Sequence, residues 1–483
     1  MALNVIPDPL TTRAKDSEAM VPYWDKVDAI IDGIDAMRNA GPTFLPKFVK
    51  EGPEAYAFRK QQTKMTNVYR DIIEGLASKP FEQSVTLIGD EQASAVPSEI
   101  ETFQWDVDGS GNNMTVFAAN TFFNGINSAI DWIWVDYDKP DPNVRTMADQ
   151  RRSGRRPYWS HVLGRNVLEA RSKIIAGKEV LTYIRILEPG NPDHVRVFQR
   201  NADETVTWEL YQRTDKIVPE RDSYFAQVDG GTISIGEIPL IPFVTGRRDG
   251  RSWRVFPAMQ DAADLQVELY QQESGLKFAK VLTAFPMLAA NGMKPPVGQD
   301  GKPLVDVAVG PNVILWGIPD GNGNVGSWSY VEPNAESLKF LAEDIKSTIQ
   351  NLRELGRQPL TASSSNITVI TAAVAAGKAK SAVKAWAYGL KDALENALKM
   401  TAKFMGITYD PMVHVFVDFD DWMEGEDIDA IVALNGSGKL SDETTWEELT
   451  RRGVLSTNFT AKRERERIEA EGLARVPASG DIA

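Results

Sequence analysis

The chain has 483 residues, a length that allows one large domain or roughly two to three ordinary ones. Its formal net charge of −14 argues against a protein whose whole surface grips nucleic acid, although a local basic line could still guide it. The absence of cysteine excludes disulfides, thiolate metal sites and cysteine nucleophiles. The sequence shows neither a signal-peptide pattern nor an apolar run long enough to span a bilayer, so we expect no membrane partner.

The N-terminal third is predicted to be a loose arm over residues 1–20 and then mainly helical. Apolar periodicity predicts helices over 22–39, 53–77 and 118–135. A charged loop, 138–157, follows and holds the densest basic cluster of the chain. A solvated loop is the ordinary interpretation of such a cluster, and contact with nucleic acid or an acidic partner is the alternative. Its arginines are Arg151, Arg152, Arg155 and Arg156.

The next part of the sequence has the pattern of an antiparallel β-meander. Three segments alternate polar and apolar residues between turn-forming residues: 180–187, 194–199 and 206–212. The pair Gly230-Gly231 is expected to make a turn before another strand at 232–235. The apolar run 238–244 contains two prolines, which is too many for a central strand.

Two long helices are predicted on either side of a compact, β-rich insert at 287–330. The first covers 257–283 and the second about 335–355. In the second helix, apolar residues recur at intervals of three and four: Leu338, Leu341, Ile345, Ile349, Leu352 and Leu355. Its other face is charged, and basic residues spaced seven apart form one line along it: Lys339, Lys346 and Arg353, with Arg357 just beyond.

A polar, uncharged loop separates this helix from a long alanine-rich helix, predicted over 371–405. The loop is rich in hydroxyl and amide side chains: Thr361, Ser363, Ser364, Ser365 and Asn366. Small side chains on the alanine-rich helix would allow another helix to approach closely. A strand is expected at 413–417, and shorter helices follow: 427–434, 442–452 and 461–473.

No catalytic constellation emerges from the residues alone. The glycine pattern at 321–326 lacks the strand and helix that a dinucleotide site requires, and the phosphate-loop-like segment 436–439 lacks the required glycine and hydroxyl residues. Three carboxylates could hold a cation or act as an acid/base pair, although capping of the next element is the ordinary role of such residues: Asp418, Asp420 and Asp421. The three histidines, His161, His194 and His414, are too scattered to predict a metal site or a catalytic triad. We therefore expect no cofactor and no metal.

Several short motifs occur in an order that is more specific than any one of them. In the first half they are Leu45-Pro46-Lys47-Phe48, Tyr56-x-x-Arg59, Asn67-x-Tyr69 and Pro239-x-x-Pro242-Phe243. In the second half they are Phe285-Pro286-x-Leu288, Asp418-Phe419 and Gly438-Lys439-Leu440-Ser441. With the order of the predicted elements, this chain resembles the portal, or head-to-tail connector, proteins of tailed bacteriophages over nearly its whole length. The glycine-rich segment 435–438 departs from the family pattern.

The resemblance implies an α+β portal fold with a wing, a two-helix stem, a small β-rich clip and a helical crown. It divides the chain as follows: N-terminal arm 1–20, first part of the wing 21–260, stem helices 261–285 and 333–357, clip 286–332, tunnel loop 358–370, remainder of the wing 371–455, and crown 456–483.

The function implied is that of a structural protein without enzymatic activity. Copies would form a ring, expected to be a dodecamer, at one capsid vertex of the virion after assembly in the host cytoplasm. Double-stranded DNA would pass through the ring during packaging and ejection. The expected partners are the terminase large subunit, the head-tail adaptor, and the major capsid and scaffolding proteins. The basic line and the hydroxyl-rich loop would face DNA, and few basic contacts would let it slide because each phosphate contact adds affinity.

An enzyme remains the alternative interpretation. The twelve tryptophans and the acids at 418–421 would suit a carboxylate-dependent hydrolase acting on polysaccharide, although packing in a core or an interface accounts for tryptophans more often. Replacing Asp418 and Asp420 with asparagine would abolish such an enzyme and leave ring assembly largely intact.

Overall fold

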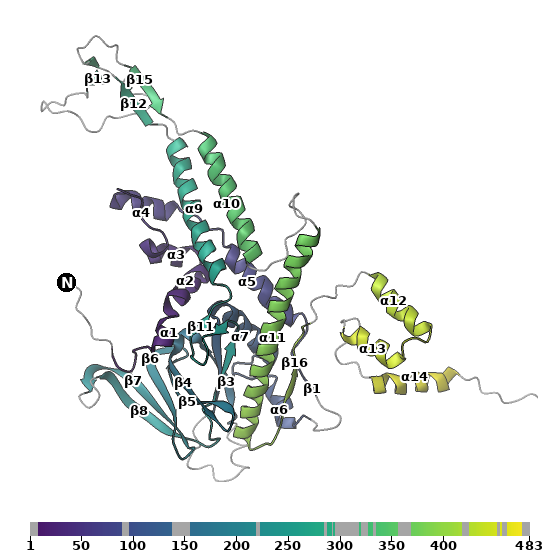
Figure 1. Cartoon of the computed structure of the whole chain (residues 1–483). Helices are drawn as coiled ribbons and strands as arrows, with labels where there is room; N and C mark the ends of the chain where they lie inside the picture. Colours follow the sequence, from purple (N-terminus) through teal and green to yellow (C-terminus); the bar gives the residue numbers. More distant parts are fainter. Residues whose placement is uncertain are drawn as a thin grey trace, which may run out of the picture.

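A two-helix hairpin projects from a mixed body of helices and sheets (Figure 1). The computed structural model describes residues 8–88, 96–137, 155–218, 223–284, 287–291, 293–294, 318–319, 327–331, 335–355, 369–417, 425–451, 455 and 461–475. Helices and antiparallel sheets are both well represented in these ranges, so the predicted α+β class is confirmed.

The N-terminal helices are shorter and more broken than predicted. They are α1 (Lys15–Glu18), α2 (Val21–Asp32), α3 (Ile34–Ala40), the 3-10 turn η1 (Gly41–Thr43), α4 (Pro53–Gln62), α5 (Val68–Ser78) and the 3-10 turn η2 (Lys79–Phe81). The single helix predicted over 22–39 is wrong because Gly33 adopts φ 92°, which ends α2 and starts α3 at a new angle. The helix predicted over 53–77 is also wrong: Thr63 is extended, and the Asn67 side chain caps a new helix by accepting from the Arg70 amide at 3.0 Å.

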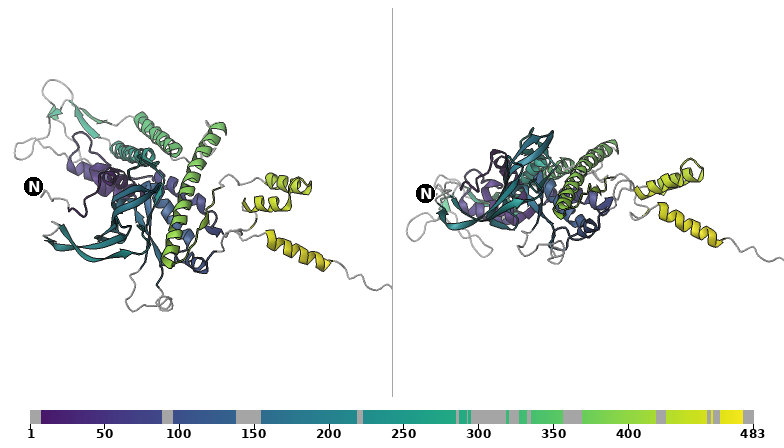
Figure 2. Two further views of the ribbon diagram at one scale, coloured as in Figure 1. Left: turned by 60° about the horizontal axis from the view of Figure 1, so that its bottom comes forward. Right: turned by 90° about the horizontal axis from the view of Figure 1, so that it is seen from below.

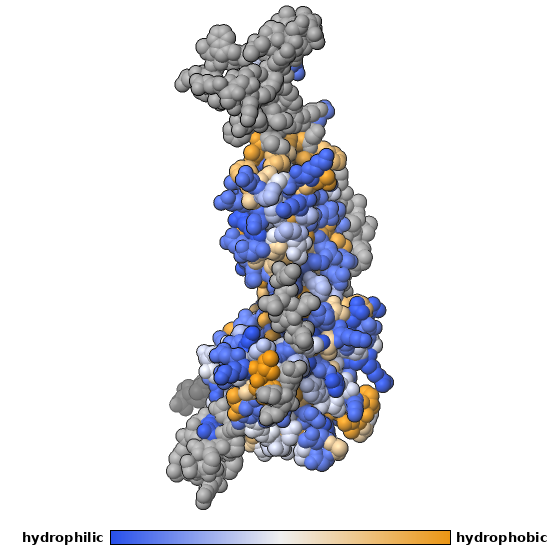
Figure 3. Space-filling view, turned by 90° about the vertical axis from the view of Figure 1, so that its left-hand side faces the viewer, coloured by the Kyte–Doolittle hydropathy of each residue, from blue (hydrophilic) through white to orange (hydrophobic). Residues whose placement is uncertain are grey.

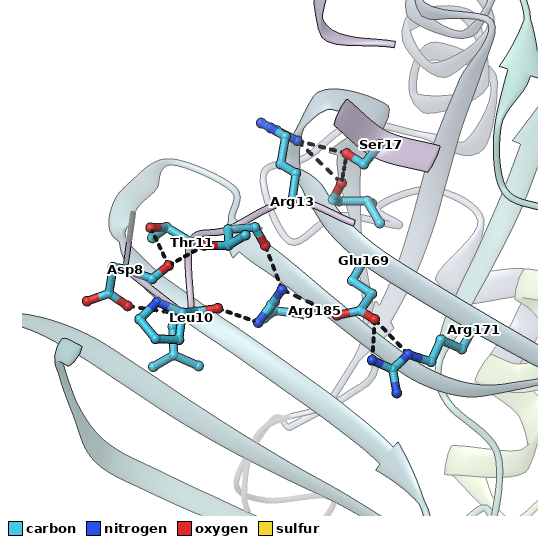
Figure 4. Close-up of polar contacts among 11 residues, drawn as sticks. Asp8, Leu10, Thr11, Arg13, Ser17, Glu169, Arg171 and Arg185 are labelled. Atoms are coloured by element: carbon cyan, nitrogen blue, oxygen red, sulfur yellow. Dashed lines mark hydrogen bonds and ion pairs between the residues drawn. The ribbon is translucent and has the colours of Figure 1, made fainter. Parts of the chain in front are cut away.

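The arm predicted to be loose is attached to the body from Asp8 onward. The Asp8 carboxylate accepts hydrogen bonds from the Ser223 hydroxyl and the Tyr224 amide. Arg185 donates to the carbonyls of Pro9 and Thr12, at 2.8 and 2.6 Å (Figure 4). These contacts place Leu10 against a small apolar cluster on the five-stranded sheet. The expectation of a loose arm is therefore wrong for residues 8–20, and residues 1–7 lie outside the described ranges.

The helix predicted over 118–135 is in fact a helix followed by a strand. Helix α7 (Met114–Ser128) ends at Ala129, whose φ of 71° is unusual for a residue with a side chain, and β2 (Ile130–Asp136) begins at once. Strand β2 lies between β3 (Tyr158–Leu163) and β9 (Leu240–Val244) in a three-stranded sheet. The 3-10 turn η3 (Gly164–Asn166) follows β3. Pro242 is paired with Trp132 on the edge strand β9, which agrees with the predicted exclusion of this proline-rich run from a central position.

The predicted meander forms a five-stranded antiparallel sheet in sequence order. Its strands are β4 (Val167–Ile175), β5 (Lys178–Glu188), β6 (Asn191–Arg200), β7 (Val206–Val218) and β8 (Ser223–Ile233). The turn predicted at Gly230-Gly231 is wrong, because both glycines lie inside β8 and pair with Glu209 and Trp208 of β7. A Cβ at Gly231 would meet the Trp208 indole at 3.1 Å, so the glycine lets this ring lie close to the strand.

The second half is dominated by long helices, as predicted. Helix α9 (Gln260–Ala284) and helix α10 (Ala335–Leu355) pack side by side as the hairpin. Short strands lie beyond their ends: β12 (Met287–Asn291) pairs with β15 (Ser327–Val331), and β13 (Met293–Lys294) with β14 (Ile318–Pro319). Helix α11 (Val369–Met405) contacts β2, β9 and α7 and covers the three-stranded sheet. The Trp159 indole donates to the Thr401 hydroxyl at 2.8 Å, which ties the sheet to α11 inside the main core.

The remaining elements are short. They are β1 (Thr86–Ile88), α6 (Ser98–Phe103), β10 (Arg247–Arg248), β11 (Val255–Phe256), β16 (Met412–His414), α12 (Gly425–Gly436), α13 (Asp442–Arg451) and α14 (Ala461–Arg475). Strand β16, predicted over 413–417, pairs with β1. The Ser441 hydroxyl accepts from the Thr444 amide at 3.2 Å, so Ser441 caps α13. Helices α12 to α14 stand apart from the body in each view (Figures 1 and 2).

Candidate functional site

The predicted basic line lies on the hairpin, along α10. Its apolar stripe packs toward α9 and the core, with Leu352 fully buried and Ile345 and Ile349 partly buried. Lys339 and Lys346 are exposed on another face. Arg353, the third member of the line, forms an ion pair with Asp71 of α5 at 3.0 Å. Its charge is therefore partly compensated where the hairpin meets the body.

The helix that carries this line is not basic overall. Helix α10 contains four acidic and three basic residues. A polyanion on this face would meet few cations, and each phosphate contact adds salt-dependent affinity. The surface is suited to weak contact with a polyanion rather than to tight binding.

The other predicted DNA-facing residues lie outside the described residues. They are Arg357, Thr361, Ser363, Ser364, Ser365 and Asn366. The same applies to Gly356, to most of the insert between α9 and α10, and to the acids Asp418, Asp420 and Asp421, on which the hydrolase alternative depends.

A buried ion pair anchors the hairpin to the body. Arg59 is only 3% exposed, and its guanidinium makes two hydrogen bonds to the Glu51 carboxylate, at 2.8 and 2.9 Å. The same guanidinium donates to the Pro46 carbonyl at 2.7 Å and to the Ser274 hydroxyl of α9 at 3.2 Å. It also lies over the Phe48 ring. The hydrogen bonds from Arg59 hold the pKa of Glu51 below its usual value.

Polar side chains along the first half of α9 extend this anchor. Gln266, fully buried, accepts from the Tyr69 amide and donates to the Thr66 carbonyl, at 2.9 and 3.0 Å. Glu273 accepts from the Thr66 amide, and Gln271 donates to the Phe44 carbonyl. These bonds join α9 to the segments before α4 and α5. They fix the direction in which the hairpin leaves the body.

Three of the sequence motifs on which the resemblance rests, at 45–48, 56–59 and 67–69, contribute to this anchor, a role that sequence reasoning missed. Tyr56 donates its hydroxyl to the Leu45 carbonyl, and Asn67 donates to the Ile30 carbonyl while it caps α5. Tyr69 is fully buried and reaches Asn127 with its hydroxyl. The available signal was the four-residue spacing of Gln266, Tyr270 and Ser274, which places polar groups on an inward face of α9.

The three histidines do not come together. His161 is on β3, His194 on β6 and His414 on β16, in three different sheets. His161 does meet a serine and an aspartate: His161 Nε2 is 2.9 Å from Asp131 Oδ2, and the Ser128 hydroxyl donates to Asp131 Oδ1 at 2.7 Å. In a nucleophilic triad the histidine lies between the other two residues. Here Asp131 lies between Ser128 and His161, so the histidine cannot take a proton from the serine. The cluster instead joins α7, β2 and β3.

The described residues show neither a metal-binding cluster nor a membrane-spanning helix. Within these ranges, no group of three or more histidine, cysteine or acidic side chains is arranged to hold a metal ion. No helix in the same ranges is long and apolar enough to cross a membrane.

Residues 258–405 match a protein family described as "Domain of unknown function (DUF4055)". The match begins just before α9 and ends with α11, so it covers the hairpin, the insert at its tip and the long helix. No curated protein matches the sequence.

The chain aligns with chains in solved structures of gene transfer agent (GTA) particles. A chain of the virion of the native particle aligns with a TM-score of 0.41 and 9% identity, over 87% of this chain and 99% of that one. A chain from the neck of the empty particle, computed with C6 symmetry, gives 0.42 and 11%, over 86% and 97%. One from the neck of the native particle, computed with C12 symmetry, gives 0.37 and 11%, over 79% and 89%. Similarity at this level does not assign a function to the chain.

Proposed function

We propose that this chain is the portal subunit of a phage-like particle, a ring-forming structural protein through which double-stranded DNA enters and leaves the capsid. The observation that carries the proposal is the projecting hairpin, α9 and α10, with paired strands beyond its tip and a long helix, α11, back on the body (Figure 1). The 21 residues of α10 extend about 30 Å. Such hairpins, side by side in a ring, would form the wall of a channel.

The proposal assigns a part to each segment. Residues 261–285 and 333–357 would be the stem and 358–370 the tunnel loop. The clip, 286–332, would contact the terminase large subunit during packaging and the head-tail adaptor afterwards. The two wing segments, 21–260 and 371–455, would carry the contacts with scaffolding and major capsid proteins, next to the arm, 1–20, and the crown, 456–483.

The electrostatics of the hairpin support a conduit. A channel must guide DNA without holding it, and α10 combines a few exposed cations with a larger number of acids. We assign Lys339 and Lys346 to the DNA-facing side of the wall. The chain itself would perform no enzymatic step, because the packaging ATPase would belong to the terminase.

Removal of the gene from a particle-producing strain tests this function. Capsids made without the chain should contain no DNA and carry no tails, and the wild-type chain supplied from a plasmid should restore both. DNA-filled, tailed particles made in the absence of the chain would contradict the proposal.

A further inference from the structure

An apolar patch lies beside α9 on the side where α4 packs. We group Phe48, Val49 and Phe58 in this patch: they are 45, 93 and 47% exposed, and Arg59, the residue after Phe58, lies over the Phe48 ring at 4.0 Å. Phe48 contacts Phe278 of α9, with ring centroids 6.1 Å apart, which fixes the patch against the hairpin. On the face of the molecule seen in Figure 3, apolar side chains gather on the upper part of the projection, directly below the grey residues of its tip. Exposed large side chains grouped in this way mark an interaction surface.

A single large apolar side chain projects from the other flank of the hairpin. Phe340 on α10 is 69% exposed and is not part of the stripe that packs against α9. Helix α9 contacts both α4 and α10, and it lies between them (Figure 1). The Phe48–Val49–Phe58 patch and Phe340 are therefore on opposite flanks of one hairpin.

The two flanks are level along the hairpin axis. Gln272 of α9 donates to Asp344 of α10 at 3.0 Å, which fixes the register of the two antiparallel helices. From this point toward the tip, Phe340 is four residues away and Phe278 is six. At about 1.5 Å per residue these distances are about 6 and 9 Å, so Phe340 and the ring that touches Phe48 differ in height by only about 3 Å.

The charges around the two flanks are opposite in sign. Lys47 and Lys50 flank Phe48 and Val49 in the sequence and are exposed, and Lys64 follows α4; Glu54 on α4 is an exposed acid among them, which leaves a positive balance on this side. One helical turn from Phe340 on either side are exposed acids: Glu336, Glu343 and Asp344. If a second copy of this chain lay beside the first at the same height along the hairpin axis, the acidic flank of one hairpin would face the basic flank of the next.

We propose that Phe340 of one copy packs on the Phe48–Val49–Phe58 patch of the neighbouring copy. This contact is heterologous, because each copy uses a different surface on each side. Heterologous contacts close into a ring when the rotation brings the last copy back to the first, and form open filaments when each step also rises along the axis. The equal height of the two flanks favours closure. The inference rests on the proposed function and names the surfaces that would join the subunits.

The natural absence of cysteine makes a direct test possible. The double variants Val49→Cys/Phe340→Cys and Phe58→Cys/Phe340→Cys should, after mild oxidation, give a ladder of disulfide-linked oligomers in a non-reducing gel. Each single variant can link at most two chains, so it should give no ladder. A matched control is Val49→Cys/Trp105→Cys, because Trp105 is 68% exposed and follows α6, which lies far from α4 (Figure 1). The oxidation is done both on the purified full chain and in particle-producing cells.

The outcomes separate the interface from the function. Ladders from either Phe340 pair, with none from the control, support the contact. Rings seen by electron microscopy without a ladder from either pair would overturn the interface and leave the portal function standing. Neither rings nor ladders, in the purified protein and in cells, would overturn both.

Discussion

Arg59 shows how much the position of the hairpin depends on one side chain. Its guanidinium bonds to Glu51, Pro46 and Ser274 while almost completely buried. Removing it would leave the Glu51 carboxylate buried without its cation, which typically costs about 3–5 kcal/mol. We expect Arg59→Ala to lower the free energy of unfolding by about this amount, as measured by urea denaturation.

Arg70→Ala is the matched control for this change. Arg70 pairs with Glu74 one turn along α5, and both side chains are more than half exposed. Exposed pairs of this kind contribute about 0.3–0.5 kcal/mol, so this variant should unfold almost like the wild type. Equal losses in the two variants would show that the buried pair does not anchor the hairpin.

The same pair makes stability depend on pH in a defined direction. The pKa of Glu51 is lowered from its ordinary value of 4.5, chiefly by the hydrogen bonds from Arg59. The folded state therefore binds fewer protons than the unfolded state near this pH. The contribution of Glu51 is complete above about pH 4.5 and is lost as the pH falls through the folded-state pKa. Glu51→Gln should show a smaller loss of unfolding free energy on acidification than the wild type. An equal loss in both would contradict this assignment.

Lys339 and Lys346 are the described residues that the conduit proposal places next to DNA. Changing both to glutamate would replace two attractive charges with repulsive ones along the proposed channel, and lost phosphate contacts weaken DNA binding. We expect fewer DNA-filled particles and more DNA loss from those that do fill, measured by nuclease protection. Lys173→Glu, on an exposed position of β4, is the control and should package normally. Normal packaging by the double variant would exclude the two lysines from the channel contact.

Between packed elements, replacing glycine with alanine is expected to have opposite effects on stability at two helical positions. A Cβ at Gly125 of α7 would lie 2.3 Å from the buried Phe243 ring of β9, whereas a Cβ at Gly275 of α9 would meet nothing within 4 Å. Gly125→Ala should destabilise the protein by about 1–3 kcal/mol through overpacking. Gly275→Ala should stabilise it by about 0.5–1 kcal/mol, because alanine is the better helix former. Thermal unfolding of both variants checks the pair, and stabilisation by Gly125→Ala would show that α7 and β9 are not in close contact.

The elements that could be predicted are those with one buried and one exposed face, because their apolar residues recur at a regular interval in the sequence. Helix α10 buries one stripe and exposes the rest, so its bounds agree closely with the prediction. Strand β2 is buried on both faces from Ile130 to Val135, so its sequence shows no alternation and cannot be distinguished from a buried helix. The change from helix to strand occurs at Ala129, which has no local signal for a positive φ. The break at Gly33 was missed because apolar residues continue on both sides of it.

At the scale of the whole molecule, the order of the long helices and the insert could be predicted, but the anchor could not. The contacts of Arg59, Gln266 and Ser274 join segments about two hundred residues apart in sequence. Such pairings follow from the tertiary fold and leave no periodic pattern. The same limit applies to the two flanks proposed to join neighbouring copies, because Phe48 and Phe340 become level only when α9 and α10 pack in register.

Whether copies of this chain form a closed ring is decided by native mass spectrometry of the purified 483-residue chain. We expect one dominant species whose mass is that of many copies of the 53.5 kDa chain, and images of the same sample should show a central hole. A protein that stays at 53.5 kDa when purified, and is present in particles only as single copies, would contradict it.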